Sequence, residues 1–266
     1  MNEIGIDSLS LSQYMPLTQT MVDQIAFMIQ KNGFSSLGGS SVGKPEYFHQ
    51  TFTTYDYFQQ NVQLMQQNNK PIGAYFFSYA WDYDSAYYEA TLECTAIDGY
   101  TYKPDWPIFI DWEQGSRNAV VAKGFSITPA RMEAIVHGWR DGCYAKGYRA
   151  GFYTGAAIAR DDFGATLIQS LRDEDIYFWE AHYKVQTPYI VPYDIWQYYA
   201  GESNWGDPWM GTVVDWNKIG DDRMWNISPS PPPPTPPTPT PSTIPIWLKI
   251  KMAQGGSNNG KCTLLL

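Results

Sequence analysis

The chain has 266 residues, a net charge of −9 and 44% hydrophobic residues, which is enough apolar material for a sizeable globular core. The acidic balance and the lack of a basic stripe argue against nucleic acid as a partner, because phosphate binding draws on clustered Lys and Arg. We also expect no membrane span and no Sec-type export signal, since the sequence lacks both a long apolar segment and a basic region before an apolar one.

Short apolar strands alternate with helical segments over most of the chain. Strands are expected at residues 4–7, 33–37, 72–78, 108–113, 150–154, 177–180 and 194–198. Helical periodicity covers residues 21–30, 55–67, 85–96, 129–145 and 156–171, and Thr128-Pro129 has the residue types of an N-cap and a first helical position. Strands separated by helices imply crossover connections and a mainly parallel sheet.

An α/β fold with a (β/α) barrel is the expected architecture, and an open doubly wound sheet is the alternative. A dinucleotide-binding sheet would carry G-x-G-x-x-G after the first strand, where this chain has DSLSLS at residues 7–12. The phosphate-loop and nucleophile-elbow motifs are also missing from the sequence. We therefore favour the barrel and expect no cofactor.

The cysteines and histidines are too few and too scattered for a zinc site or a disulfide scaffold, so we expect no metal. Cys94 and Cys143 are expected to be buried free thiols. A disulfide between them remains the alternative in an extracellular setting, because sequence spacing alone cannot establish one.

The composition changes abruptly near Ile227, which divides the chain into three predicted parts. Residues 1–227 form the barrel, and residues 228–245 are almost wholly Pro, Thr and Ser, which favours an extended linker. Residues 246–266 are too few for an independent core, so they are a tail, a truncated module or a docking peptide.

The segment Asp111-Trp112-Glu113 ends a short apolar run and is the first candidate for chemistry. Because successive side chains of a strand point to opposite faces, both carboxylates would share one face and Trp112 would occupy the other. Acidic side chains at the end of a buried strand are costly unless a site needs them. The alternative is a solvated acidic pair at a loop.

Two further acids follow predicted strands, Asp7 after the first and Asp215 after the last. Active-site groups of a barrel lie at the C-terminal ends of its strands, so all four acids could meet at one end. Clustered carboxylates repel one another, which raises the pKa of at least one and keeps it protonated near neutral pH. A proton donor beside an ionised acid is what cleavage of a glycosidic bond requires.

Aromatic residues at the strands support a carbohydrate site, since flat rings stack on sugars. The candidates for substrate binding, including the amide between two of the rings, are Tyr75, Phe77, Tyr153, Trp179, Trp196, Gln197 and Tyr198. The alternative is that many of these rings fill the barrel core, because interior layers also need bulky side chains.

Seven segments in order give the chain a resemblance to the family 25 glycoside hydrolases, which are lysozymes of the N-acetylmuramidase type. The segments are GID at 5–7 followed by SQ at 12–13, PIGAYFF at 71–77, IFIDWE at 108–113, GFYT at 151–154, FWEAHY at 178–183, IWQY at 195–198 and VDWN at 214–217. The likeness runs from about residue 3 to about residue 218.

The resemblance implies an irregular TIM-like barrel that hydrolyses the β-1,4 bond between N-acetylmuramic acid and N-acetylglucosamine. Glu113 would be the general acid, and Asp111 would either stabilise positive charge or orient the substrate's acetamido group. Asp7 and Asp215 would hold and tune that pair. The implied partner is bacterial peptidoglycan, acted on outside a cell or during lysis of a host by a phage or prophage endolysin, and we expect a monomer.

The chain departs from the family pattern at several positions. Ser8-Leu9 replaces the usual Val-Ser, Phe76 replaces a His, and Glu180 replaces an apolar residue after Trp179. The second strand, expected at residues 33–37, lacks the Lys-Ala-Thr/Ser-Glu-Gly type of ending. These departures leave two alternatives to a muramidase: a non-catalytic barrel that binds cell-wall carbohydrate, or a glycosidase for another polysaccharide.

Overall fold

The fold is a closed barrel of eight strands, seen in a computed structural model that describes residues 4–8, 16–34, 57–183, 185–190, 192–200 and 214–227. The strands are β1 (Ile4–Ser8), β2 (Met28–Phe34), β3 (Ile72–Phe77), β4 (Ile108–Asp111), β5 (Ala150–Gly155), β6 (Tyr177–Ala181), β7 (Ile195–Tyr199) and β8 (Asp215–Ile219). Strands β1 to β7 pair in parallel with their neighbours in chain order. The prediction of an α/β barrel is confirmed.

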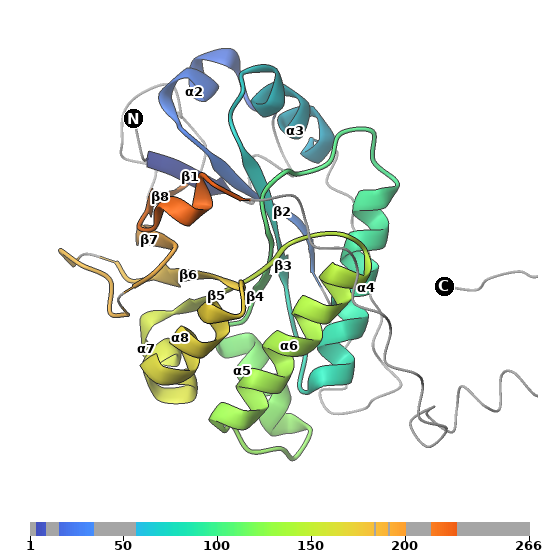
Figure 1. Cartoon of the computed structure of the whole chain (residues 1–266), viewed down its shortest axis with the longest axis vertical. Coiled ribbons are helices and arrows are strands. Elements are labelled where there is room, and N and C mark those ends of the chain that lie inside the picture. The colour runs from blue at the N-terminus through green and yellow to red at the C-terminus, as the bar shows by residue number, and fades with distance from the viewer. Residues whose placement is uncertain are drawn as a thin grey trace, which may run out of the picture. The chain divides into compact units, whose positions relative to one another are not determined.

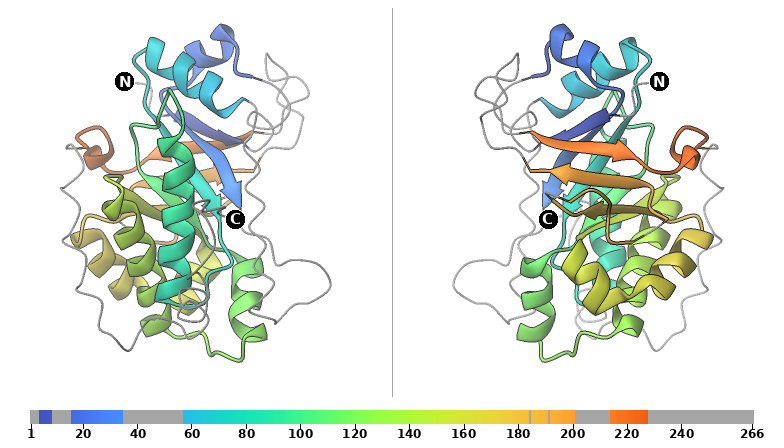
Figure 2. Two further views of the ribbon diagram at one scale, coloured as in Figure 1. Left: turned by 90° about the vertical axis from the view of Figure 1, so that its right-hand side faces the viewer. Right: turned by 90° about the vertical axis from the view of Figure 1, so that its left-hand side faces the viewer.

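Strand β8 closes the barrel by pairing antiparallel with both β1 and β7. Figure 2 shows β7 and β8 side by side and running in opposite directions in its right-hand view. The sequence pattern predicts Asp215 after the last strand and does not indicate β8. Its five residues carry three polar side chains, so it lacks the apolar run by which the other strands were recognised.

Helices flank the barrel, and α4 packs closely on α6 (Figure 1). The α-helices are α2 (Gln19–Gln24), α3 (Phe58–Gln67), α4 (Tyr83–Asp98), α5 (Gln114–Ala122), α6 (Pro129–Ala145), α7 (Ala156–Ile158) and α8 (Ala165–Asp173), with a π-helical turn η2 (Ala159–Phe163) and a 3₁₀ turn η3 (Asp222–Met224). Thr128 caps α6 as predicted, because its hydroxyl oxygen accepts a hydrogen bond from the Arg131 N–H at 3.2 Å.

Neighbouring residues of a strand face two different apolar layers. On β3, Phe76 packs outward against Trp139 of α6, with ring centroids 5.7 Å apart. Tyr75 points into the barrel, where its ring lies 5.9 Å from that of Trp179. The alternation of a β-strand thus gives an outer layer between sheet and helices and a smaller aromatic layer inside the barrel.

The second strand lies earlier in the chain than predicted. The expected helix 21–30 ends at Gln24, and β2 occupies Met28–Phe34 instead of 33–37, of which residues 35–37 lie outside the described part. The apolar run of Phe27, Met28 and Ile29 fits a short buried strand as well as a helix, which is why periodicity misplaced it. Likewise, the expected helix 156–171 is interrupted at Gly164, whose φ of +77° is incompatible with helix continuation.

The chain divides into a compact unit of residues 1–233 and a second unit of residues 234–266. The predicted linker 228–245 and tail 246–266 lie outside the described residues and stay predictions. Within the described part, no helix has the length and apolar character needed to cross a membrane. Cys94 and Cys143 are buried free thiols on α4 and α6.

Candidate active site

The four predicted acids belong to one end of the barrel. Asp7 lies in β1, Asp111 is the last residue of β4, and Glu113 is the N-cap of α5. Asp215 is the first residue of β8, and because that strand is antiparallel, its start lies at the end of the barrel where the parallel strands finish. Asp7 and Asp215 are direct partners in the β1–β8 register.

The side chains of Asp111 and Glu113 share one side of the chain, as predicted, although β4 ends two residues earlier than expected. Glu113 keeps an extended backbone, with φ −126° and ψ −165°, so the alternation of faces continues beyond the strand. Trp112 points the other way and is 2% exposed, with its indole N–H donating to the Ala80 carbonyl at 3.3 Å. The two carboxyl groups therefore face the barrel end together.

Two amide side chains, those of Gln197 and Asn217, hydrogen-bond to the other acids of the site, Asp7 and Asp215. The Gln197 amide donates to Asp7 Oδ2 at 2.7 Å and to Asp215 Oδ2 at 3.3 Å. The Asn217 amide donates to the same Asp7 oxygen at 2.8 Å, and its own carbonyl accepts from the Trp179 indole N–H at 2.8 Å. Asp7 is thus held by two donors in a buried position.

Burial raises the pKa of Asp7 well above the usual carboxyl range, and the negative charge of Asp215 raises it further. The hydrogen bonds from Asn217 and Gln197 oppose this effect because they stabilise the ionised form. These two amides therefore tune the charge of Asp7 as well as its position.

Burial also raises the pKa values of Asp111 and Glu113. The negative charge of Glu113 adds to the effect at Asp111, whereas the ammonium of Lys31 lowers the pKa of both acids. Such a pair titrates as a unit and can hold one proton near neutral pH. The arrangement provides a proton donor next to a carboxylate.

Lys31, on β2, is a site residue that the sequence analysis missed. Its ammonium lies over the rings of Phe77 at 5.1 Å, Tyr75 at 5.7 Å and Phe34 at 5.8 Å from the centroids. Burial lowers the pKa of Lys31, while Asp111 and Glu113 oppose this by favouring the charged form. The departure from the family pattern is expected at residues 33–37, most of which follow β2. Strand β2 itself carries a lysine, Lys31.

A bulge in β2 brings Lys31 and Phe34 to the same face. Lys31 pairs with Tyr75, but Gly33 pairs with the next residue of β3, so Asn32 is the extra residue. The Asn32 amide points away from the barrel interior and donates to Glu93 of α4 at 2.9 Å. A Cβ at Gly33 would lie 2.7 Å from Glu93 Oε2 and 2.8 Å from the Phe76 ring, so glycine is required there.

Tyr153 and Tyr183 close the site near Glu113. The Tyr153 hydroxyl donates to Gln197 Oε1 at 2.7 Å, and it lies close enough to Glu113 to lower the pKa of that acid. The Tyr183 hydroxyl donates to the same Gln197 oxygen at 2.5 Å, and the side chain is 39% exposed. Tyr183 was not predicted as a site residue because it follows β6 in a connecting segment, where no periodicity indicates its direction.

The remaining predicted aromatic residues divide by strand face. Trp179 is 1% exposed and lies inside the barrel. Its ring centroid is 4.4 Å from that of Tyr153, so Trp179 packs beneath a ring of the site and is not itself exposed to a substrate. Trp196 and Tyr198 lie on the outer face, with the Lys218 ammonium 5.8 Å and 4.6 Å from their ring centroids. The structure therefore does not bring Trp196 and Tyr198 to the four acids, since the adjacent Gln197 takes the inward position.

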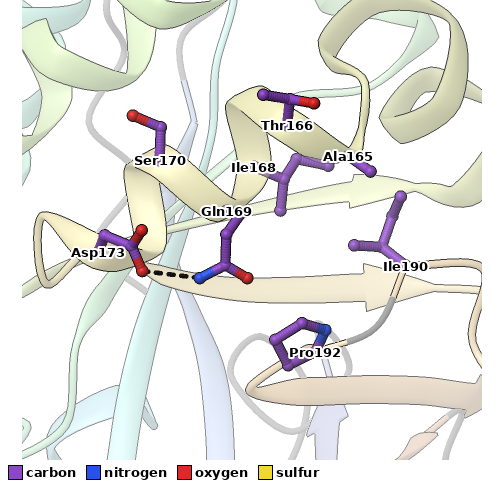
Figure 3. Close-up of a pocket in the computed structure, with 8 residues that line it drawn as sticks. All are labelled: Ala165, Thr166, Ile168, Gln169, Ser170, Asp173, Ile190 and Pro192. Carbon is purple, nitrogen blue, oxygen red and sulfur yellow. Dashed lines mark hydrogen bonds between the residues drawn. The ribbon is translucent and has the colours of Figure 1, made fainter.

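A cavity of about 550 Å³ lies elsewhere, between α8 and the segment that precedes β7 (Figure 3). Its lining residues are Ala165, Thr166, Ile168, Gln169, Ser170, Asp173, Ile190 and Pro192. The Gln169 amide donates to Asp173 across its edge at 2.7 Å. None of the four acids contributes to it. The part of the chain that the structure describes also holds no cluster of His, Cys, Asp or Glu suited to a metal ion.

Three solved structures share this fold at low sequence identity. The CTP1L endolysin has a TM-score of 0.57 and 17% identity, over 86% of this chain and 71% of that one. The autolysin LytC from Streptococcus pneumoniae has a TM-score of 0.56 and 18% identity, over 81% of this chain but only 46% of LytC. The catalytic domain of endolysin ply40, from bacteriophage P40 of Listeria monocytogenes, has a TM-score of 0.53 and 16% identity, over 85% and 97%.

The sequence of the chain supplies the family assignment. No curated protein sequence gives a significant match. The profile of the Glycosyl hydrolases family 25 matches residues 51–206, which is more than half of the chain and includes Asp111 and Glu113. Asp7 and Asp215 lie outside the matched segment. The pairing of β8 with β1, which closes the barrel, brings them to the same end as Asp111 and Glu113. The chain belongs to glycosyl hydrolase family 25.

Proposed function

We propose that this protein is a lysozyme that hydrolyses the β-1,4 bond between N-acetylmuramic acid and N-acetylglucosamine in bacterial peptidoglycan. The observation that carries the proposal is the coupled Asp111–Glu113 pair beside Lys31, at the end of a family 25 barrel. A structure of the LytC autolysin, which shares the fold, has been solved in complex with a synthetic peptidoglycan ligand.

Glu113 is the proposed general acid. Of the two paired acids it is the more exposed, so it is the one that can reach the glycosidic oxygen of a bound sugar chain. Proton transfer from Glu113 to that oxygen assists its departure, while positive charge develops at the sugar carbon. Burial raises the pKa of Glu113, which favours the protonated form that a general acid needs.

Asp111 is the proposed partner of that positive charge. It either stabilises the oxocarbenium-like centre directly or orients the acetamido group of the substrate as an internal nucleophile. Lys31 lowers the pKa of Asp111 against the effect of burial, and so favours the ionised form that either role needs. Asp7 and Asp215, fixed by Gln197 and Asn217, tune the field around the pair.

Tyr75, Phe77 and Tyr153 are the proposed sugar-contacting rings, together with the exposed Tyr183. All four lie around Lys31 or Glu113. We propose further that the protein acts on the cell wall, outside a cell or during host lysis. Residues 228–245 would then be a linker and residues 246–266 a segment that contributes to wall binding.

Analysis of the sugars released from purified peptidoglycan tests the proposal. New reducing ends at muramic acid are expected, and their absence would refute it. Chitin and β-glucan serve as comparison substrates, because preferential cleavage of either would show a glycosidase of different specificity. Wall binding without any turnover would show a carbohydrate-binding barrel instead.

A further inference from the structure

The segment that follows β3 holds the catalytic pair in place from outside the barrel. The Ser78 N–H donates to the backbone carbonyl of Asp111 at 3.0 Å. The Trp112 indole N–H donates to the carbonyl of Ala80 at 3.3 Å. Residues 78–80 therefore contact two successive residues of the Asp111–Glu113 segment.

A third connection reaches Glu113 through a serine of α5. The Glu113 N–H donates to Ser116 Oγ at 3.1 Å, and the Ser116 hydroxyl donates to the Ser78 carbonyl at 2.5 Å. Ser116 is fully buried. The Ser116 hydroxyl has a single proton, which it donates to the Ser78 carbonyl. Its oxygen therefore acts as the acceptor for the Glu113 N–H.

The anchor of residues 78–80 is a buried carboxylate on α4. Glu89 is 1% exposed; its Oε2 accepts from the Ser78 hydroxyl at 2.5 Å and its Oε1 from the Tyr79 N–H at 3.3 Å. Ser78 Oγ in turn accepts from the Ala80 N–H at 3.0 Å. Each hydroxyl in the chain from Glu89 to Glu113 thus donates once and accepts once.

We propose that Glu89 is a positioning residue for the reaction: through Ser78 and Ser116 it fixes the backbone from which Glu113 reaches the substrate. The inference rests on the proposed function of Glu113 as proton donor. Glu89 does not touch the reacting atoms, but a misplacement of about 1 Å at a catalytic group can lower the rate by about 10²-fold. A buried carboxylate is costly to place, and here it satisfies two donors that belong to the loop supporting the acids.

Glu89→Gln tests this without changing the size of the side chain. A carboxylate accepts from both donors, whereas an amide presents an oxygen to only one and an NH₂ group to the other. Either Ser78 or Tyr79 then loses its acceptor. Ser116→Ala is the second variant, since it removes the hydroxyl that joins Ser78 to Glu113 and needs no extra space.

Glu93→Gln is the matched control on the same helix. Glu93 is also fully buried one turn further along α4, but its carboxyl group accepts a hydrogen bond from Asn32 of β2 instead of from residues 78–80. Burial raises the pKa of Glu93 to about 8, so the side chain is mostly protonated at pH 7 and an amide imitates it well. Glu93→Gln should leave kcat unchanged at that pH.

The kinetic test compares wild type with these variants on peptidoglycan at pH 7, well below the melting temperature of each. Glu89→Gln and Ser116→Ala should each lower kcat by about 10- to 100-fold with KM within about twofold, because the placement of Glu113 changes and sugar binding does not. The double variant should lose little more than either single one, since both break the same chain. Unchanged kcat in Glu89→Gln, or losses that multiply in the double variant, would overturn the inference.

Amide hydrogen exchange of Glu113 provides a readout that needs no turnover. Exchange of the Glu113 N–H should become at least about tenfold faster in Glu89→Gln and stay unchanged in Glu93→Gln. Equal protection in wild type and Glu89→Gln would refute the positioning role. A wild-type protein that releases no reducing ends would refute the proposed function instead, and the exchange data would still decide the role of Glu89.

Discussion

Asp7 and Asp215 lie opposite each other in the β1–β8 register, 208 residues apart in sequence, and both accept from the amide of Gln197. Antiparallel closure of the barrel is what makes this possible. Two like charges in register repel each other, and the amide donors between them offset that repulsion. The amides of Gln197 and Asn217 therefore favour the ionised form of Asp7 beside Asp215.

Asn217→Leu should weaken both the site and the fold. The substitution removes a donor from buried Asp7 and the acceptor of the Trp179 indole N–H, so two buried polar groups lose partners. We expect the free energy of unfolding to fall by about 1–3 kcal/mol, as measured by urea denaturation, and kcat to fall about tenfold. Asn226→Leu, at a turn outside the barrel, is the control. Wild-type values for Asn217→Leu would contradict the role assigned to this amide.

Glu113→Gln should abolish most of the activity while the fold remains intact. The general acid is worth about 10² to 10⁴ in rate, and the side chain is only partly buried. Release of reducing ends and a thermal melt measure the two effects. Asp161→Asn makes the same chemical change at an exposed acid and should have no effect on activity. Substantial turnover by Glu113→Gln would remove Glu113 from the mechanism.

Asp111→Asn should lower kcat and shift the pH dependence of what remains. In the proposed mechanism Asp111 is ionised while Glu113 holds the proton, so loss of this negative neighbour makes ionisation of Glu113 easier and lowers the pKa of Glu113. Because Glu113 must be protonated to act, the alkaline limb of the kcat profile is expected at lower pH than in wild type. A profile of kcat from pH 4 to pH 9 measures this. An unmoved alkaline limb would show that the two acids do not titrate as a pair.

Lys31→Met should move the alkaline limb of the kcat profile to higher pH, opposite to the effect of Asp111→Asn. The ammonium lowers the pKa values of Asp111 and Glu113, so its removal raises both and keeps Glu113 protonated to higher pH. Met retains an apolar stem that can pack on Tyr75 and Phe77. We also expect kcat to fall, because Asp111 ionises less readily. A shift to lower pH, or none, would contradict the position that we assign to Lys31.

Glu93→Gln should change how stability depends on pH. Burial raises the pKa of Glu93 from 4.5 to about 8, so the folded state binds a proton more tightly than the unfolded state does. Its contribution is full below pH 4.5 and is lost as the pH rises through about 8. The glutamine of the variant does not titrate, so the variant does not lose stability in this way. Between pH 4.5 and about 8, its free energy of unfolding relative to that of the wild type should therefore rise by on the order of a few kcal/mol. Melting temperatures at pH 5 and pH 9 measure it, and parallel curves would contradict the prediction.

The sequence was sufficient for the features that depend on local pattern. Apolar runs located most strands of the barrel, and the alternation of Asp111, Trp112 and Glu113 predicted which side chains share a face. A proline after a capping threonine predicted the start of α6. These features follow from two or three neighbouring residues, so they do not depend on the rest of the fold.

The features that the sequence did not reveal depend on contacts between distant strands. Strand β8 is polar and is defined by its pairing with β1 and β7, so no apolar run indicated it. Trp196 and Gln197 are adjacent, and only the barrel shows that the amide faces inward while the indole faces outward. The helical appearance of residues 25–30 concealed β2 and, with it, Lys31.

The bulge at Asn32 makes the number of residues in β2 important, because the extra residue places Lys31 and Phe34 on the same face. Many substitutions along it would alter one contact each, but deletion of a single residue at the bulge would restore regular pairing with β3. Either Lys31 or Phe34 would then turn toward the helices, and the ammonium would lose its place beside the acids or its aromatic neighbour. The site therefore depends on the number of residues between Lys31 and Phe34 as well as on the identity of these two residues.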